Sequence, residues 1–316
     1  MSITTTGNAL RQRKISEVMF RGFGILALLL VLVPAIWLIG SVVAHAAPHW
    51  KWSVLWSSLS VQDTGGLRDE ILGTLILMLG VLIIAGSIGV LAGIHLSEFA
   101  KTRKNGKPSG GALRIASDVL SGFPSIVLGY VGYAALVVGL HWGYSLLSAL
   151  IILSIMVIPY IAKTTESSLR QVPTAYREGA VALGMTAGYS LRKIVLKTAL
   201  PGIVTGLLLA MAIASGETAP LIYTAGFSNT LPHGIVLTHA QFPYLTYAVF
   251  TFYNAPAAQA HYVAFDAALI LVVLILLLLV ISRIFVARTQ RHTEGGAGRT
   301  PRRPPLGGGG TAAPTA

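Results

Sequence analysis

The chain has 316 residues, of which 54% are hydrophobic and only 11% are charged, and its mean hydropathy is +0.72. Soluble domains carry roughly 25% charged residues, so this composition excludes an ordinary soluble enzyme and predicts an all-α polytopic membrane protein. The formal net charge is +12. However, the basic residues lie between the apolar stretches, where they set orientation instead of binding nucleic acid. The absence of cysteine excludes disulfides, thiol catalysis and cysteine-ligated metals.

Six stretches approach or exceed the roughly 20 apolar residues that are needed to cross the hydrocarbon core of a bilayer. Because the backbone must satisfy its own hydrogen bonds in lipid, each stretch is predicted to form a helix. In the second stretch, Gly89 and Gly93 have the GxxxG spacing that predicts close packing against another helix. The expected spans are Gly22–Ala44, Ile71–Leu96, Ile115–Leu140, Tyr144–Ala162, Pro201–Gly226 and Tyr262–Ile284.

Orientation follows from the positions of lysine and arginine. With the N-terminus in the cytoplasm, all of the 23 basic residues except Lys51 and Arg68 lie on the cytoplasmic side, as the positive-inside rule requires. Both termini are therefore expected in the cytoplasm. We expect three regions: a cytoplasmic segment at 1–20, a transmembrane domain at 21–290 with a cytoplasmic loop at 164–199, and a disordered cytoplasmic tail at 291–316.

Glu217 is a carboxylate inside the fifth expected span. A charge at the centre of a span costs on the order of 2.5–3.5 kcal/mol, so such residues usually have a function. Pro220 cannot donate a hydrogen bond to the carbonyl of Gly216, so the helix is expected to loosen beside the charge. We interpret Glu217, Thr218 and Pro220 as part of a translocation path. The alternative is a carboxylate that only seals the packing between helices.

The third expected span has a second weak point at Pro124 and Ser125. Pro124 frees the carbonyl of Leu120 from its helical hydrogen bond. A freed carbonyl and a serine hydroxyl could together line a path for a polar solute. An ordinary proline kink, satisfied by neighbouring helices, explains the same residues equally well.

The cytoplasmic loop mixes apolar residues with Arg177 and Glu178. A short amphipathic helix ended by Gly184 would fit a groove on a soluble partner, and a helix on the membrane surface is the alternative. The chain has no nucleotide-binding loop, Ser-His-Asp signature or paired catalytic carboxylates, so we assign no catalytic residue and no enzyme activity. We also assign no metal site, because Pro48 interrupts the pair His45 and His49 and no third ligand is near in sequence.

The same loop resembles the EAA motif of ABC importer permeases, in which Glu-Ala-Ala is followed by a glycine after three residues. Glu178, Gly179, Ala180 and Gly184 keep that spacing. Gly179 replaces the first alanine of the motif, and Lys197 stands where a proline is usual. The resemblance implies that Glu178, Gly179, Ala180 and Gly184 belong to a coupling helix seated in a cleft of an ATP-binding subunit.

The segment from Gly216 to Leu221 reads GETAPL and is similar to a signature of the phosphate-importer permeases, the PstA family. The run from Pro124 to Val127 is a further match. This resemblance implies a six-helix type I ABC importer (MetI-like) permease fold in a bacterial inner or plasma membrane. It also implies that phosphate is the solute and that Pro124, Ser125, Glu217, Thr218 and Pro220 line its path.

The resemblance further implies a set of partners. They are a second permease subunit (PstC-like), two ATP-binding subunits (PstB-like) and an extracytoplasmic phosphate-binding protein (PstS-like), with ATP and Mg²⁺ held by the ATP-binding subunits and no cofactor in this chain. The family generally has an arginine four residues before the glutamate, where this chain has Ile213. We therefore expect Glu217 to find its partner on the second permease.

Two other functions remain open from the sequence. A permease for another solute in the same superfamily would keep the EAA loop. A proton-coupled secondary transporter or a membrane scaffold would work without any ATPase partner, and the coupling loop argues against both.

Overall fold

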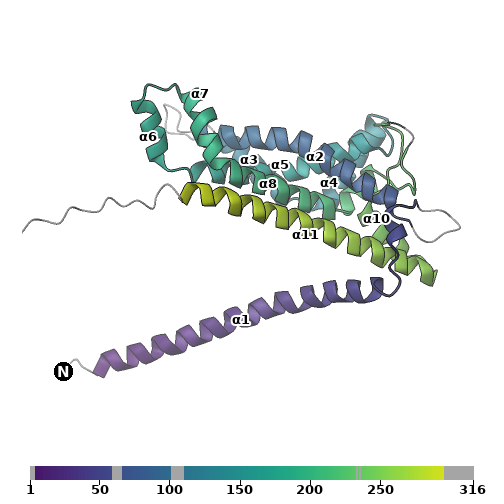
Figure 1. Ribbon diagram of the computed structural model, residues 1–316, viewed down its shortest axis with the longest axis horizontal. Helices are drawn as coiled ribbons and strands as arrows, with labels where there is room; N and C mark the ends of the chain where they lie inside the picture. Colours follow the sequence, from purple (N-terminus) through teal and green to yellow (C-terminus); the bar gives the residue numbers. More distant parts are fainter. Residues whose placement is uncertain (1–3, 59–65, 101–109, 233, 235, 295–316) are drawn as a thin grey trace, which may run out of the picture.

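The computed structural model describes residues 4–58, 66–100, 110–232, 234 and 236–294, and within these ranges its regular elements are all helical (Figure 1). The α-helices are α1 (Thr4–Ala46), α2 (Arg68–Ile94), α3 (Gly111–Gly122), α4 (Ser125–Gly132), α5 (Leu146–Arg170), α6 (Thr174–Ala182), α7 (Ala187–Ser190), α8 (Leu196–Gly216), α9 (Ala219–Thr224), α10 (Leu245–Tyr253) and α11 (Ala258–Glu294). A 3₁₀ turn forms at Trp52–Leu55, and π-helical turns form at His95–Phe99, Tyr133–Gly139 and Leu191–Val195.

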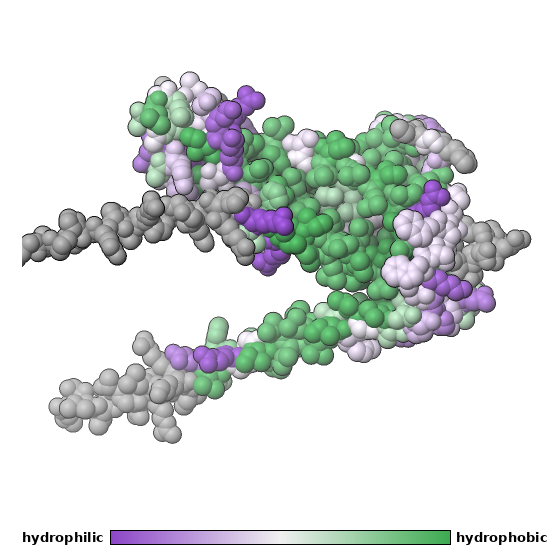
Figure 2. Space-filling view, in the orientation of Figure 1, coloured by the Kyte–Doolittle hydropathy of each residue, from purple (hydrophilic) through white to green (hydrophobic). Residues whose placement is uncertain are grey.

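The prediction of an all-α membrane protein is confirmed. Among the described residues, five helical stretches are long and apolar enough to cross a membrane, and a sixth crossing results if α3 and α4 are counted as one bent span. The long helices α2, α8 and α11 run side by side along the bundle in Figure 1. The surface of the bundle is apolar in its middle, and its polar residues gather at the two ends (Figure 2).

The expected span Ile115–Leu140 consists of two helices that meet at the predicted weak point. α3 and α4 meet at an angle of 100°, because Phe123 and Pro124 both adopt extended backbone conformations between them. Proline has no N–H to continue the first helix, and its carbonyl instead begins the next one by accepting the N–H of Val127 at 3.0 Å. The Leu120 carbonyl is not free, since it accepts the N–H of Phe123 at 3.4 Å.

The fifth span also differs from the prediction. Its helical stretch runs from Ala187 to Gly216, so Pro201 lies inside α8 and does not begin the span. Glu217 has an extended backbone that ends α8, and α9 starts two residues later with Pro220 in its first turn. Proline is favoured there because the first N–H groups of a helix have no partner within the helix. The expected helix Pro201–Gly226 is therefore two helices.

The expected loop at 164–199 is largely helical. α5 continues to Arg170, and the next membrane-length stretch begins at Ala187, so both helices extend into the segment 164–199. Within the expected C-terminal tail, α11 continues to Glu294, and residues 295–316 lie outside the described part of the chain.

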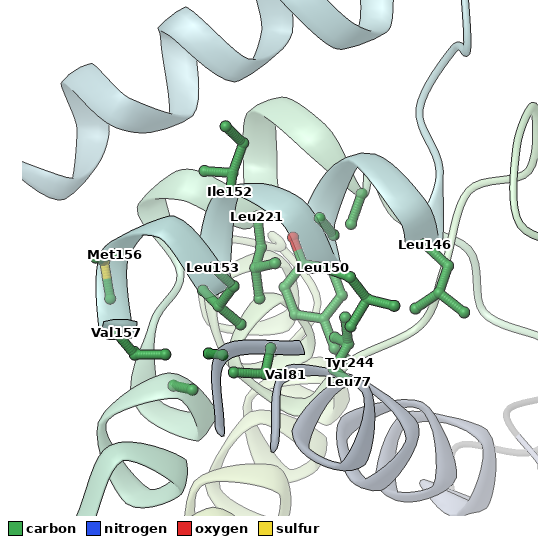
Figure 3. Close-up of a cluster of buried hydrophobic side chains, with 14 of the residues drawn as sticks. Leu77, Val81, Leu146, Leu150, Ile152, Leu153, Met156, Val157, Leu221 and Tyr244 are labelled. Carbon is green, nitrogen blue, oxygen red and sulfur yellow. The ribbon is translucent and has the colours of Figure 1, made fainter. Parts of the chain in front are cut away.

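The main hydrophobic core lies between α2, α5 and α8 and includes the first turn of α9 and Tyr244 (Figure 3). Its fully buried residues include Val81 of α2, Leu153 and Val157 of α5, and Leu221 of α9. Burying such side chains contributes about 1.5–3 kcal/mol each relative to water. Inside the membrane this hydrophobic gain is smaller, because lipid tails are as apolar as the side chains. Van der Waals packing between the helices then contributes more of the stability. The break between α8 and α9 therefore lies against the main core.

The predicted close packing at Gly89 and Gly93 is confirmed. A Cβ atom at Gly89 would lie 2.7 Å from the Cβ of Ile161, and one at Gly93 would lie 2.5 Å from the Cβ of Thr165. Both neighbours belong to α5, which makes the most extensive helix contact in the chain with α2. Glycine at these positions lets the two backbones approach closely.

α1 leaves the bundle. It diverges from α11 after meeting it near one end (Figure 1), where His45 stacks on Phe265 with ring centroids 4.6 Å apart. None of the apolar window of α1 is buried within the chain. The N-terminal end of α1, the end of α11, and α6 and α7 all lie at one end of the molecule, while α10 lies at the other.

Candidate functional site

The two helix breaks predicted at Pro124 and Pro220 face each other. Across them, the side chains of Glu217 and Ser125 interact. One turn further along, a Cβ atom at Gly129 would lie 2.6 Å from the Cα of Pro220, so α4 and α9 touch backbone to backbone. The structure therefore brings two segments that are far apart in the sequence into one polar site inside an apolar bundle.

Glu217 has a second anchor at its backbone. Its carbonyl accepts a hydrogen bond of 3.0 Å from the hydroxyl of Thr246 in α10. Ile213, at the position of the family's arginine, packs against the main core one turn back in α8. Among the described residues, the side chain that interacts with this carboxylate is Ser125, a neutral residue of the same chain that was not expected there. The expected ionic partner on a second permease remains a prediction.

All five residues predicted to line the path lie at these breaks. Ser125, Glu217 and Thr218 are half-buried, Pro220 is buried and Pro124 is exposed. The polar side chains thus comprise one carboxylate, which accepts hydrogen bonds, and two hydroxyls, which can donate or accept. Among the described residues no group of three His, Asp or Glu could hold a metal ion. The chemistry available at the breaks is hydrogen bonding.

Charged residues gather on one side of the breaks, in α3 and α5. Lys163 Nζ lies 2.8 Å from Asp118 Oδ1 and donates to the Ser121 hydroxyl at 3.2 Å. Glu166 pairs with Arg114 at 2.8 Å and with Arg170 at 2.7 Å. From the sequence, Lys163 was expected only to help fix the orientation of the chain. Lys163, Glu166 and Arg170 are spaced three and four residues apart, which places them on one face of a helix. The contact of Lys163 with Ser121 depends on tertiary packing and could not be predicted from this spacing.

The residues of the EAA motif form the predicted short helix. Glu178, Gly179 and Ala180 lie in α6, which ends before Gly184 with a positive φ of +73° at that glycine. Glu178 and Gly179 are exposed, while Ala180 is buried. Val181 and Leu183 are 71% and 75% exposed, so α6 presents apolar side chains outward at the end of the molecule. Such a knob can enter an apolar groove or the membrane surface.

α6 is fastened to the bundle by Arg177. Its guanidinium pairs with Glu98 at 2.5 Å and donates to the carbonyl of Leu169 at 3.1 Å. Glu98 follows the end of α2, and Leu169 is buried in the last turn of α5. One side chain next to Glu178 thus contacts the ends of both core helices.

A comparison with protein-family models identifies the family of this chain. Residues 87–291, more than half of the chain, match the model of the binding-protein-dependent transport system inner membrane component. The chain belongs to this family. The matched region contains both breaks and α6, so the resemblance read from the EAA loop and the GETAPL segment is confirmed for this multi-pass inner-membrane permease.

Curated relatives of the permease are similar over most of their length. It is 53% identical to "Phosphate transport system permease protein PstA 2" of Mycobacterium tuberculosis over 279 residues, which cover 86% of this chain and 88% of the relative. It is 32% identical to "Probable phosphate transport system permease protein PstA" of Methanocaldococcus jannaschii, covering 77% and 84%. It is 30% identical to PstA of Yersinia pestis, covering 71% and 73%.

Solved structures confirm the expected permease fold. A chain of the MetNI methionine ABC transporter in an inward-facing conformation matches with a TM-score of 0.52 and 22% identity, over 75% of this permease and 99% of that chain. An amino acid ABC transporter matches with a TM-score of 0.50 and 17% identity, over 70% and 94%. At these identities the likeness concerns the fold alone.

Proposed function

We propose that this permease carries phosphate across the membrane as one subunit of an ATP-driven importer. The observation that carries the proposal is the pair of facing breaks, in which the GETAPL segment places Glu217 against Ser125. The 53% identity to a protein named as a phosphate transport permease supports the choice of solute. ATP hydrolysis is assigned to a partner, and this chain supplies half of the path.

The exposed surfaces support the proposed partners. The apolar windows of α1 and α11 are 0% and 6% buried within the chain, and in the assembly they are available to a second, PstC-like permease. α6 presents Val181 and Leu183 for a groove of a PstB-like ATP-binding subunit. An extracytoplasmic phosphate-binding protein would meet the opposite end, near α10. ATP binding would pull the two coupling helices of the pair together and switch the path from inward- to outward-facing.

The proposed orientation places both termini in the cytoplasm. The end of the molecule that holds α6, α7, the start of α1 and the end of α11 (Figure 1) is the end that the positive-inside rule assigns to the cytoplasm. On this orientation Lys163 and the ion pairs of Glu166 lie on the inner side of the breaks.

The test is phosphate uptake after Glu178→Ala, together with co-purification of the ATP-binding subunit. Glu178 is exposed on α6, so the substitution should remove a docking contact without disturbing the bundle. We expect uptake and co-purification to fall together. Glu17→Ala, which removes an exposed carboxylate from α1, is the matched control and should change neither.

The same assay separates the competing functions. Uptake inhibited by excess unlabelled phosphate, and not by sulfate, supports the phosphate importer, whereas the reverse would indicate another solute. Uptake that persists without any ATP-binding subunit would refute the importer and support a secondary transporter.

A further inference from the structure

Four tyrosines form a connected cluster beside the breaks. Tyr130 lies with its ring centroid 6.5 Å from that of Tyr133 and 6.2 Å from that of Tyr223, and Tyr133 lies 6.0 Å from Tyr144. The cluster draws its members from α4, the π-helical turn that follows it, the loop before α5, and α9. We call it the tyrosine cluster.

The tyrosine cluster continues directly from the Glu217–Ser125 contact. Tyr130 adjoins Gly129, whose backbone packs against Pro220, and Tyr223 lies three residues beyond Pro220. Five residues separate Tyr130 from Ser125, which corresponds to about 7.5 Å along a helix. All four phenol rings are half-buried or exposed within this chain. The cluster therefore forms an open surface that begins at the breaks.

This part of the chain has no positive side chain. Residues 125–139 and 217–224 contain no lysine or arginine, and Glu217 is their single charged residue. An anion that passes a carboxylate here would need hydrogen-bond donors that carry no charge. Phenol hydroxyls are such donors, and hydrogen bonds to a charged group are stronger than those between neutral groups.

We propose that the tyrosine cluster binds the transported oxyanion through its phenol hydroxyls, on the side of the Glu217–Ser125 contact that faces away from Lys163. This inference rests on the proposed function and specifies its binding groups. Neutral donors hold an anion weakly, which suits a path that must also release its solute. The tyrosine cluster is distinct from a membrane-interface aromatic belt, because Tyr130 and Tyr223 adjoin the backbone contact between α4 and α9, and because the rings of Tyr133 and Tyr144 contact each other.

The test uses tyrosine-to-phenylalanine changes, which remove only the hydroxyl and keep the ring packing. The assembled importer, reconstituted in liposomes with phosphate-loaded binding protein, is compared for the wild type, Tyr130→Phe/Tyr223→Phe and Tyr130→Phe/Tyr133→Phe/Tyr223→Phe. We expect phosphate transported per ATP hydrolysed to fall about tenfold in the triple variant, the effect of roughly one lost hydrogen bond to an anion. Tyr253→Phe, an exposed tyrosine of α10 outside the cluster, is the control and should transport normally.

Each outcome decides the inference. Reduced transport with intact assembly and intact ATP hydrolysis supports it, and unchanged transport in the triple variant overturns it. A loss of assembly in the triple variant, with normal transport by the folded double variant, also overturns it. If the wild type transports a different oxyanion and no phosphate, the proposed function fails, and the same variants assayed with that oxyanion decide whether the tyrosine cluster binds it.

Discussion

Removing Arg177 should uncouple ATP hydrolysis from transport while leaving the complex assembled. Arg177 is the side chain through which α6 contacts both Glu98, at 2.5 Å, and the carbonyl of Leu169, at 3.1 Å. Arg177→Met keeps the length and apolar stem of the side chain and deletes the guanidinium. Force received by α6 would then reach the ends of α2 and α5 only through weaker contacts.

The size of the effect follows from the burial of the pair. The side chains of Arg177 and Glu98 are 24% and 13% exposed. A hydrogen bond to a charged group contributes about 1.5–3 kcal/mol when buried, and partial exposure reduces this. We expect a loss of about 1–2 kcal/mol, or about tenfold in the population of the coupled arrangement.

The assay measures phosphate transported per ATP hydrolysed in liposomes, together with co-purification of the ATP-binding subunit. Arg170→Met is the matched control, because Arg170 pairs with Glu166 at 2.7 Å but is 57% exposed and lies within α5. The exchanged pair Arg177→Glu/Glu98→Arg should recover part of the coupling. Full coupling in Arg177→Met would refute the reasoning, since it would show that α6 is held by other contacts.

Three further predictions concern the breaks and the core. Ser125→Ala and Glu217→Ala should each reduce phosphate uptake, and the double variant should lose less than the sum of the two losses, because either change removes the same interaction between the two side chains; additive losses would contradict a direct contact. Gly93→Leu should lower the free energy of unfolding by about 3 kcal/mol, because the new side chain forces α2 away from α5. The measurement is the yield of folded protein in detergent. Gly22→Leu is the control and should express normally, since a Cβ atom at Gly22 would have nothing within 4 Å. Glu70→Met should increase the free energy of unfolding by about 1–3 kcal/mol and so raise the thermal midpoint. Glu70 is fully buried, and neither carboxylate oxygen has a hydrogen-bond partner among the described residues. A lower midpoint would show that Glu70 has a partner beyond them.

Helices and weak points could be read from the sequence because both are local properties. The length of an apolar stretch predicts a crossing, and a proline predicts where a helix ends. The GxxxG pair also predicted its contact, since a glycine pair on a helix leaves room for a neighbouring backbone. The site residues were found by the same local logic: Glu217 stands out as a charge in an apolar segment, and Pro124 as a missing donor.

The meeting of the breaks could not be read in this way. Ser125 and Glu217 contact each other because α2, α5 and α8 pack into a core that carries α9 against α4. Pro201 was expected to begin a span because the apolar residues that follow it reach membrane length, yet α8 already runs through it. Lys163 was missed because its neighbour Ser121 lies on another helix.

The separation of α1 from the bundle has a consequence for how this sequence tolerates change. The apolar window of α5 is 67% buried within the chain, whereas that of α1 is 0% buried. Exchanges among leucine, isoleucine, valine and phenylalanine should therefore be accepted freely along α1 and rejected along α5. A systematic survey of substitutions would then divide the membrane helices into two classes. Along α5 the size and shape of the side chains would be constrained. Along α1 only their hydropathy would be constrained, except where another subunit contacts the helix.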